Sequence, residues 1–358
     1  MPLVCPCVFF CANIPNGGLE MLPKRLVFCG GGTRCLVYLQ ALVELERRGT
    51  LAHVKDYWGT SAGALVASLL ALSRSAVKTK ALMLNTDYVR FRDFDVGNLL
   101  SITTTWGIDD GFALTRQLTT LFETLEPGSS KKTLLDVEGL NIVVSDLTSH
   151  ETIVCNGTTY PSLPLIEALR ASMSLPLFFK PYLHTPSGHL WVDGAVRANF
   201  PWHVLPSDEA RHESLGFSFE KPWMGGPRTF SEYLFSMIHF DEPRKILSYK
   251  AKYPRNILWF PTPPYPAWFC TLRPEDFVLV DSIGQATVDR WLTDDSSHPP
   301  ERSGTPPRSS LPGTLGPVSP PHYTVETSDT LTPLTAPDPD SSRHQWPYRR
   351  PSSRRWSV

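Results

Sequence analysis

A serine set between two glycines, in Gly59-Thr60-Ser61-Ala62-Gly63, is the side chain of this sequence best suited to nucleophilic attack. The preceding residues, His53 to Trp58, are predicted as a short buried strand, and Ala62 to Leu72, apolar nearly all round, as a buried helix. A Gly-x-Ser-x-Gly turn between a strand and a helix lifts the serine hydroxyl out of the sheet. The chemistry indicated is attack of the Ser61 oxygen on an acyl group; a tight turn with a bystander serine is the alternative.

A run of three glycines supplies a second part of the same chemistry. The predicted strand Lys24 to Cys29 leads directly into Gly30-Gly31-Gly32-Thr33-Arg34. Successive glycines let backbone N–H groups face one point without side chains in the way. Beside a nucleophilic serine, such a loop is a natural oxyanion hole. A purely structural turn is again the alternative.

Two other functions of a glycine loop fit these residues less well. A dinucleotide-binding fingerprint requires glycine at position 35, where Cys35 stands, and an acidic residue after the second strand, where Gly59 stands. A Walker loop requires Gly-Lys-Ser/Thr, and this loop has no lysine.

The elements between the two loops place them side by side. A predicted helix from Leu36 to Arg48, ended by Gly49, joins the two strands, so residues 24–63 form one βαβ unit. The strands of such a unit are parallel, with a right-handed crossover, and we expect them to be neighbours. Open α/β sheets bind ligands at the carboxyl ends of their strands. We therefore expect the glycine loop and Ser61 at one edge of the sheet.

A carboxylate in a similar setting occurs much later in the chain. The predicted strand His189 to Val192 ends in Asp193-Gly194-Ala195. The two small residues after Asp193 allow another backbone to approach closely, as Gly59 and Gly63 do around the serine. A plain capping role for Asp193 is the alternative.

Other patterns predict the rest of the domain. The proline-flanked stretch Phe178 to Tyr182 is a candidate lining of an acyl pocket, with a packed loop as the alternative. Predicted helices are Phe112–Leu125, Leu163–Ala171, Arg228–Lys250 and Glu275–Leu292; predicted strands are Leu140–Asp146 and Glu151–Cys155, as a hairpin, and Asn256–Phe260.

Composition narrows the class of protein. The 358 residues carry 34 basic and 35 acidic side chains, a balance that gives no reason to expect nucleic-acid binding. Seven cysteines without paired spacing indicate a reduced, intracellular protein and no metal site. No apolar run is long enough to span a bilayer.

Three regions are predicted along the chain. Residues 1–23 are expected to be an unstructured leader, and residues 24–292 a single catalytic domain. Residues 293–358 are rich in Pro, Ser, Thr and Arg, so they cannot build a core and are expected to be disordered.

Taken together, these motifs resemble the patatin-like phospholipase family. The matching blocks are Gly30–Arg34, Gly59–Gly63, Arg170–Pro176, Asp193–Ala195 and Ala198–Pro201, in the family's order. The resemblance covers about residues 24–260. It implies an α/β fold of three layers, α/β/α, with a doubly wound, mainly parallel sheet.

The resemblance also assigns roles within a Ser–Asp dyad that has no histidine. Ser61 would be the nucleophile and Asp193 the base, with the Gly30, Gly31 and Gly32 loop as oxyanion hole. In the cytosolic phospholipases that share the glycine–arginine signature, the arginine matching Arg34 helps to hold the lipid phosphate. One departure is Cys35, where many members have glycine, and it puts the geometry of the loop in question. No motif demands a metal or an organic cofactor.

The expected function is therefore a phospholipase A type acyl hydrolase acting on glycerophospholipids. Its expected partners are the acyl-lipid substrate and a peripheral membrane surface, and its expected location is intracellular: cytoplasmic, with contact to membranes or lipid droplets. The sequence does not determine the oligomeric state. Alternatives are a triacylglycerol lipase or transacylase on the same dyad, an α/β-hydrolase triad using His203, His212 or His239, and an inactive lipid-binding scaffold.

Overall fold

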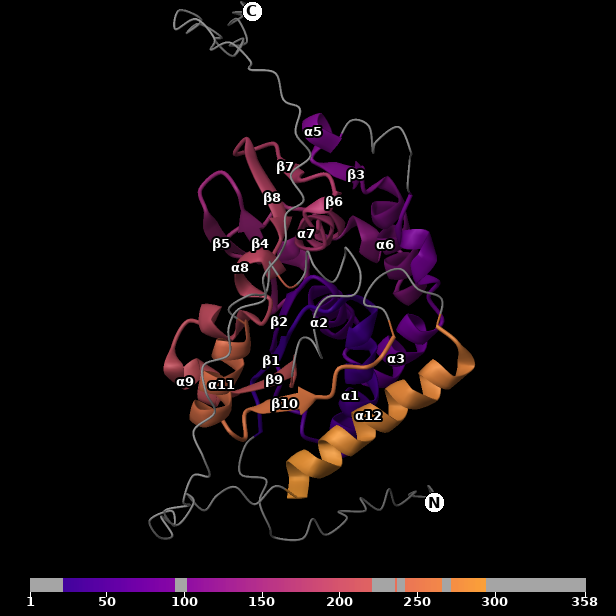
Figure 1. Ribbon diagram of the computed structural model, residues 1–358, viewed down its shortest axis with the longest axis vertical. Coiled ribbons are helices and arrows are strands. Elements are labelled where there is room, and N and C mark those ends of the chain that lie inside the picture. The colour runs from indigo at the N-terminus through magenta and orange to yellow at the C-terminus, as the bar shows by residue number, and fades with distance from the viewer. Residues whose placement is uncertain (1–21, 94–101, 221–235, 237–241, 266–271, 294–358) are drawn as a thin grey trace, which may run out of the picture. The chain divides into compact units, whose positions relative to one another are not determined.

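The βαβ unit expected near the start of the chain forms and lies at the centre of the sheet (Figure 1). Strands β1 (Arg25–Phe28) and β2 (Asp56–Thr60) are parallel neighbours, joined by the 3-10 helix η1 (Gly32–Leu36) and helix α1 (Val37–Arg47). Gly49 follows α1 with φ of 76°, a left-handed conformation that ends a helix. The β2 strand begins three residues later than predicted, because residues 51–53 form a turn.

The computed structural model describes residues 22–93, 102–220, 236, 242–265 and 272–293. All of them belong to one compact unit, Met1–Pro299. The leader and the tail fall almost wholly outside the described residues, as does most of the helix predicted from Arg228, so these remain predictions. Among the described residues, no helix combines the length and apolar character needed to cross a bilayer.

The described residues form an eight-stranded central sheet. Five strands are parallel, in the order β10 (Ile257–Phe260), β9 (Ser214–Phe219), β1, β2 and β4 (Leu140–Asp146). From β1 the chain first adds β2 and β4 on one side and later β9 and β10 on the other. The predicted doubly wound, mainly parallel sheet is therefore confirmed.

The remaining strands add an antiparallel part at β4. Strand β5 (Glu151–Cys155) pairs with β4 as the predicted hairpin. Strand β8 (His189–Asp193) also runs antiparallel to β4, and β7 (Tyr182–His184) pairs with β8. A separate two-stranded parallel sheet, β3 (Gly107–Asp109) with β6 (Leu177–Phe179), was not predicted.

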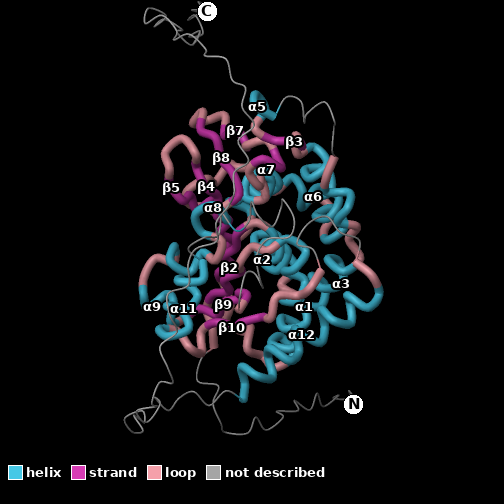
Figure 2. Tube along the Cα trace, in the orientation of Figure 1, coloured by secondary structure: helices cyan, strands magenta, loops and turns pink. Residues whose placement is uncertain are grey.

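Helices cover both faces of the central sheet (Figure 2). On one face, Tyr38 of α1 packs against Phe217 and Phe260 of β9 and β10. On the other, Tyr249 of α11 (Glu242–Lys252) contacts Phe200, which lies against Gly216 of β9. Because neighbouring strand residues point to opposite faces, α1 and α11 lie on opposite sides of the sheet.

The remaining helices complete these two layers. Helix α12 (Pro274–Thr293) packs along α1, where a methyl group on Gly284 would lie 2.9 Å from the Val37 carbonyl oxygen. Other helices of the described chain are α2 (Ala62–Ser73), α3 (Ala76–Leu84), α5 (Ile102–Thr105), α6 (Phe112–Leu125), α7 (Leu165–Ser172), α8 (Ala195–Ala198) and α9 (Asp208–His212), with the 3-10 helices η2 (Tyr88–Phe91), η3 (Ser129–Lys131), η4 (Leu134–Asp136) and η5 (Pro201–Val204).

Candidate active site

Ser61 occupies a strained turn between β2 and α2. Its φ of 54° and ψ of −128° lie outside the regions that non-glycine residues ordinarily adopt. The neighbouring glycines make the turn sterically possible. A methyl group on Gly59 would lie 2.4 Å from the Gly63 carbonyl oxygen, and one on Gly63 would lie 2.6 Å from the Cys29 carbonyl oxygen. Only a hydrogen atom fits at either position, so steric crowding explains why both motif positions are glycine.

The β4 strand brings Asp193 to Ser61. Strand β2 pairs with the first half of β4 and ends with Thr60 opposite Val143, while β8 pairs with the second half and ends with Asp193 opposite Val144. Strand β5 pairs with β4 along its other edge, so β2 and β8 share one edge of β4. The two strands run toward each other, and their carboxyl ends meet. Ser61 and Asp193, 132 residues apart in sequence, therefore face one another.

The two side chains are in direct hydrogen-bond contact. The Ser61 hydroxyl donates to Asp193 Oδ2 at 2.8 Å, and the Ala195 backbone N–H donates to Oδ1 at 2.8 Å. Asp193 is 1% exposed and Ser61 6% exposed. The direct contact leaves no space for an imidazole between them. Among the predicted triad histidines, His203 and His212 are exposed, and His239 lies outside the described residues.

Burial changes the acidity of Asp193. Loss of water around the carboxylate raises the pKa of Asp193 to about 7, against the smaller lowering effects of the hydrogen bonds from Ala195 and Ser61. Burial disfavours the charged form of an acid, whereas hydrogen bonds to that form favour it. A carboxylate with a pKa near neutrality is a far better proton acceptor than an ordinary aspartate.

The glycine loop lies against Ser61, and its three N–H groups differ in whether they have a hydrogen-bond acceptor. A methyl group on Gly30 would lie 3.1 Å from Ser61 Cβ, which places this loop beside the candidate nucleophile. The Gly30 N–H donates to the Asn199 carbonyl oxygen at 3.0 Å. The Gly31 and Gly32 N–H groups have no acceptor within the described part of the chain. The candidate oxyanion donors are therefore narrowed to Gly31 and Gly32.

Arg34 and Cys35 follow this loop in η1. Arg34 Nε donates to the Tyr265 carbonyl oxygen at 3.3 Å, and the side chain is half-buried outside the pocket lining. The contact between Arg34 and a lipid phosphate therefore remains a prediction. The Cys35 thiol is fully buried and donates to the Cys29 carbonyl oxygen at 3.4 Å. Burial raises the pKa of the Cys35 thiol, so it stays neutral and packs against Gly31 of the loop.

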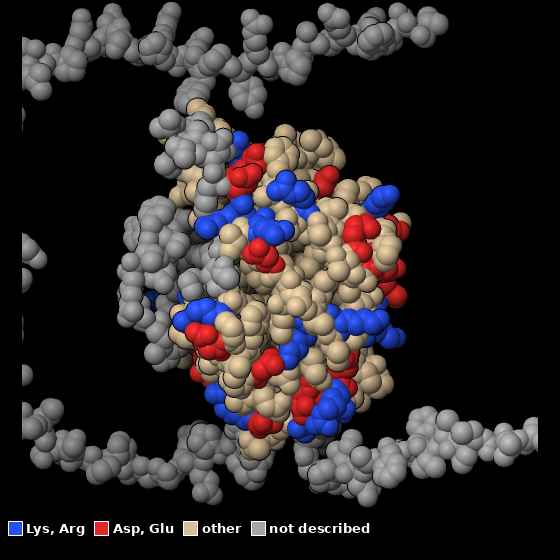
Figure 3. Space-filling view, turned by 90° about the vertical axis from the view of Figure 1, so that its right-hand side faces the viewer, with Lys and Arg blue, Asp and Glu red and all other residues tan. Residues whose placement is uncertain are grey.

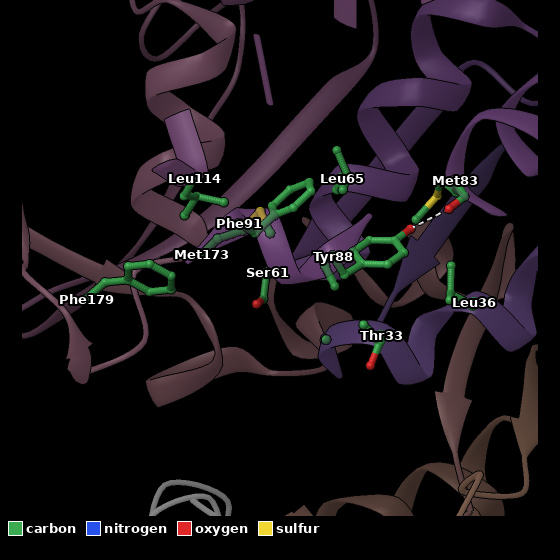
Figure 4. A pocket seen from close by; sticks show the side chains of 12 residues that line it. Thr33, Leu36, Ser61, Leu65, Met83, Tyr88, Phe91, Leu114, Met173 and Phe179 are labelled. Carbon is green, nitrogen blue, oxygen red and sulfur yellow. Dashed lines mark hydrogen bonds between the residues drawn. The ribbon is translucent and has the colours of Figure 1, made fainter. Parts of the chain in front are cut away.

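An apolar pocket opens at Ser61 (Figure 4). It holds about 560 Å³ of space, including the part open to solvent, and Gly32, Thr33, Ser61 and Ala62 form its reactive side. The other lining residues are Leu36, Leu65, Met83, Tyr88, Phe91, Leu114, Met173 and Phe179. Phe179 belongs to the stretch predicted to line an acyl pocket.

Sequence reasoning missed two polar residues that support the site. The Ser172 hydroxyl accepts the Ser61 backbone N–H at 2.9 Å and donates to the Val143 carbonyl oxygen at 2.7 Å. Asn199 holds Gly30 by its carbonyl group and donates from Nδ2 to the Cys29 thiol sulfur at 3.2 Å. Both lie in the blocks Arg170–Pro176 and Ala198–Pro201. Their presence in these two blocks indicated that Ser172 and Asn199 matter, but a sequence block does not show which groups a side chain contacts.

The described residues contain no group of three or more His, Cys, Asp or Glu side chains arranged to hold a metal ion. The side chains and backbone of the candidate site offer an alcohol, a buried carboxylate and two backbone N–H groups beside an apolar pocket.

Comparison with known proteins decides the family. The profile of the patatin-like phospholipases matches residues 26–206, just over half of the chain. This protein belongs to the patatin-like phospholipase family. Membership implies a lipid acyl hydrolase activity.

Relatives of this chain are distant. It is 29% identical to YqhO, an uncharacterized protein of Bacillus subtilis, over 298 residues that cover 74% of this chain and 97% of YqhO. Among solved structures it is similar to VipD from Legionella pneumophila, with 16% identity and a TM-score of 0.48. It is also similar to ExoU from Pseudomonas aeruginosa, with 17% identity and a TM-score of 0.42. Each comparison covers 75% of this chain, but 66% of VipD and 53% of ExoU, in both cases less than two thirds.

Proposed function

We propose that this protein is a phospholipase A type enzyme that cleaves acyl esters of glycerophospholipids through an acyl-Ser61 intermediate. The observation that carries the proposal is the 2.8 Å contact between the Ser61 hydroxyl and the buried Asp193 carboxylate, at the opening of an apolar pocket. A serine hydroxyl is a weak nucleophile until a base removes its proton, and here the base is in direct contact.

In the first half-reaction Asp193 takes the hydroxyl proton while Ser61 Oγ bonds to the ester carbonyl carbon. The carbonyl oxygen becomes an oxyanion, which the Gly31 and Gly32 N–H groups would stabilise. One such donor is typically worth about 3–4 kcal/mol in the transition state. When the intermediate collapses, the bond to the alcohol oxygen breaks, and Asp193 returns the proton to that oxygen. A lysophospholipid leaves, and the acyl group remains on Ser61.

In the second half-reaction water replaces the alcohol. Asp193 takes a proton from the water molecule as its oxygen bonds to the acyl carbon. The bond to Ser61 Oγ then breaks, Asp193 returns its proton to Ser61, and the fatty acid is released. Each half-reaction therefore uses the same base and the same two backbone donors.

The lining of the pocket favours a lipid substrate over a small polar ester. Its lining side chains other than Thr33 and Ser61 are apolar or aromatic, as in most sites that bind apolar ligands. An acyl chain gains about 0.8 kcal/mol for each methylene group removed from water. The buried cysteines Cys35 and Cys155, which form no disulfide among the described residues, support the proposed intracellular, cytoplasmic location with contact to membranes or lipid droplets.

The decisive experiment compares wild type with Ser61→Ala and Asp193→Asn on phosphatidylcholine bearing different acyl chains at its two positions, on triacylglycerol, and on phosphatidylcholine with an added lysolipid acceptor. We expect fatty-acid release from phosphatidylcholine by wild type, a loss of at least about 1,000-fold in both variants, and fluorophosphonate labelling that disappears in Ser61→Ala. Variants His203→Ala, His212→Ala and His239→Ala should keep substantial activity.

Other outcomes would replace this proposal with a named alternative. Preferred hydrolysis of triacylglycerol would indicate a lipase, and acyl transfer to the lysolipid a transacylase. Loss of activity in one histidine variant would indicate a triad. Absence of labelling in folded wild type would indicate a lipid-binding scaffold.

A further inference from the structure

Three large apolar side chains are exposed around the small β3–β6 sheet, and we call them the apolar rim: Trp106, Phe112 and Leu177. They are 53%, 74% and 42% exposed, respectively. Gly107 pairs with Leu177, so Trp106, which precedes Gly107, lies beside Leu177. Phe112 begins α6, three residues after β3 ends.

A buried arginine holds the elements of the rim together. Arg170 of α7 donates from Nη2 to the Asp110 carbonyl oxygen at 3.0 Å and to the Lys180 carbonyl oxygen at 3.1 Å. Asp110 lies two residues before Phe112, and Lys180 follows β6. The guanidinium also lies 5.3 Å from the centre of the Phe179 ring. The start of α6 and the end of β6 are therefore fixed to the same side chain.

Two rim residues have an unfavourable backbone conformation. Trp106 has φ of 58° and Leu177 has φ of 67°, a left-handed region that bulky L-residues rarely adopt. Both side chains are only about half buried, so burial offsets this strain in part at most. Among the described non-glycine residues, Ser61, the candidate nucleophile, shares this region of φ with Arg74 and His150. Positive φ therefore occurs at the candidate site and also at positions outside it, so it is the exposure of Trp106 and Leu177 that points to a function.

The rim continues into the apolar pocket. Strand β6 carries Leu177 in the rim and, two residues later, Phe179 in the pocket lining. Helix α6 contributes Phe112 to the rim and Leu114 to the pocket lining, but these two side chains point to different sides of the helix. Alternate residues of a strand share one face, so β6 is the element along which an acyl chain leaving an apolar phase at the rim reaches the pocket.

We propose that the apolar rim inserts into the surface of a zwitterionic phospholipid bilayer and delivers the acyl chain to the pocket, an inference that rests on the proposed function. Tryptophan and phenylalanine are well suited to a membrane interface because their rings pack against acyl chains. On the face shown in Figure 3, basic and acidic side chains are intermingled. The chain as a whole carries 34 basic and 35 acidic residues, so we expect apolar insertion rather than net charge to be the main source of affinity.

The test measures binding without turnover, so it can fail independently of the proposed function. Full-length Ser61→Ala protein is sedimented with phosphatidylcholine vesicles, alone and with Trp106→Ser/Leu177→Ser added. Each fully buried apolar side chain contributes a free energy equivalent to about tenfold or more in partitioning. We therefore expect the double substitution to lower the vesicle partition coefficient at least about tenfold. The matched control, Leu247→Ser/Val278→Ser, removes side chains that are 69% and 71% exposed on α11 and α12, and should leave partitioning unchanged.

A second variant separates a membrane role from a structural one. Because glycine adopts positive φ readily, Trp106→Gly relieves the backbone strain as it removes the side chain. We expect its melting temperature to equal or exceed that of the parent while vesicle binding falls. A lower melting temperature would indicate that Trp106 packs against the protein, and would overturn the proposal. Partitioning that the rim substitutions do not change, or that the control pair abolishes equally, would also overturn it.

Discussion

At the scale of single residues, the site depends on the environment of one carboxylate. Asp193 is almost inaccessible to water, and within the described part of the chain two donors stabilise its charged form, the Ser61 hydroxyl and the Ala195 N–H. A raised pKa of this kind is what the proposed proton transfer from Ser61 to Asp193 requires. The same burial makes the ionised protein less stable, so activity and stability should respond to pH in opposite directions.

Hydrolysis should follow the ionisation of Asp193. Because the free base must accept the Ser61 proton, kcat/KM is expected to fall as Asp193 is protonated, with a midpoint near its pKa of about 7. The measurement is kcat/KM for a water-soluble ester over a range from about pH 5 to pH 9. A profile without an inflection near neutrality would show that another group limits the reaction.

Replacing Asp193 should stabilise the protein at neutral and alkaline pH. Between its ordinary pKa of 3.8 and the folded value of about 7, the folded state keeps a proton that the unfolded state has released. Wild-type stability therefore falls as pH rises through this window, by about 4 kcal/mol in total. The amide of Asp193→Asn can accept from Ala195 and donate to Ser61 Oγ, and it carries no charge.

The free energy of unfolding, measured in urea, should therefore be higher for Asp193→Asn than for wild type above about pH 7. The difference should become small near about pH 4. A difference that does not vary with pH would mean that Asp193 is not the buried titrating group.

Ser172 should be a positioning residue for Ser61. Ser172→Ala removes the acceptor of the Ser61 N–H and the donor to the Val143 carbonyl, and each buried group left unpaired costs about 1–3 kcal/mol. We expect kcat to fall by about 10–100-fold with little change in KM, because the nucleophile is displaced rather than removed.

The matched control is Ser68→Ala. Ser68 is equally buried and donates to the Ala64 carbonyl oxygen within its own helix, away from the turn. Fluorophosphonate labelling per folded molecule should slow in Ser172→Ala and not in Ser68→Ala. Equal slowing in both would indicate a general effect of removing a buried hydroxyl.

At the scale of elements, the site is a junction of two strands that end against a third. Strands β2 and β8 share an edge of β4, and little space separates their ends. A methyl group on Gly194 would lie 2.3 Å from the Val143 carbonyl oxygen and 2.9 Å from Thr60 Cγ2. The glycine after Asp193 therefore sets how closely the two strand ends approach.

Gly194→Ala should separate Ser61 from Asp193. Contacts this short cannot be accommodated without a backbone shift, and overpacking of this kind costs about 1–3 kcal/mol. We expect at least about a 100-fold loss of ester hydrolysis, because a displacement of 1 Å is enough to cost this much. Gly188→Ala is the control, since Gly188 has a positive φ of 72° but nothing within 4 Å of the added methyl. The Gly188→Ala variant should lose some stability and retain activity. Full activity in Gly194→Ala would contradict the idea that Gly194 sets the distance between the ends of β2 and β8.

At the scale of the whole molecule, the pocket joins segments that are far apart in the chain. Its lining comes from η1, α2, α3, η2 and α6, and from residues after α7. Within it, the Tyr88 hydroxyl donates to the Met83 carbonyl oxygen at 2.9 Å, and its ring stacks on Phe91 at 5.6 Å (Figure 4). Tyr88 is thereby held as part of the wall formed with Met83.

Tyr88 should limit the length of the acyl chain. Tyr88→Ala would extend the pocket, so we expect the preferred ester to gain several carbons; each methylene buried contributes about 0.8 kcal/mol. Tyr88→Phe, which removes only the hydroxyl, should keep the wild-type preference. The measurement is the ratio of kcat/KM values across a series of 4-nitrophenyl esters, which does not depend on the amount of folded enzyme. An unchanged series in Tyr88→Ala would place the end of the chain elsewhere.

Local sequence patterns were sufficient for much of this fold. The βαβ unit, helix α6 and the β4–β5 hairpin match their predictions, because apolar periodicity and turn residues act over a few neighbouring positions. Strands β3, β6 and β7 were missed because three residues are too few to show a period of two. Motif residues also indicated Ser61 and Asp193 as a pair, since each follows a strand and precedes small residues.

The tertiary structure decided what no local pattern contains. It placed the ends of β2 and β8 at adjacent positions of β4, and it tied the Gly30 N–H to Asn199, which leaves Gly31 and Gly32 as the candidate donors. It also set the Ser172 hydroxyl against the backbone N–H of Ser61. It also removed water from Asp193, which is what makes its carboxylate basic. These features depend on strand register and burial between residues more than one hundred positions apart. Residue types and spacing thus determined which groups are present, and long-range packing determined which of them meet and how strongly each binds a proton.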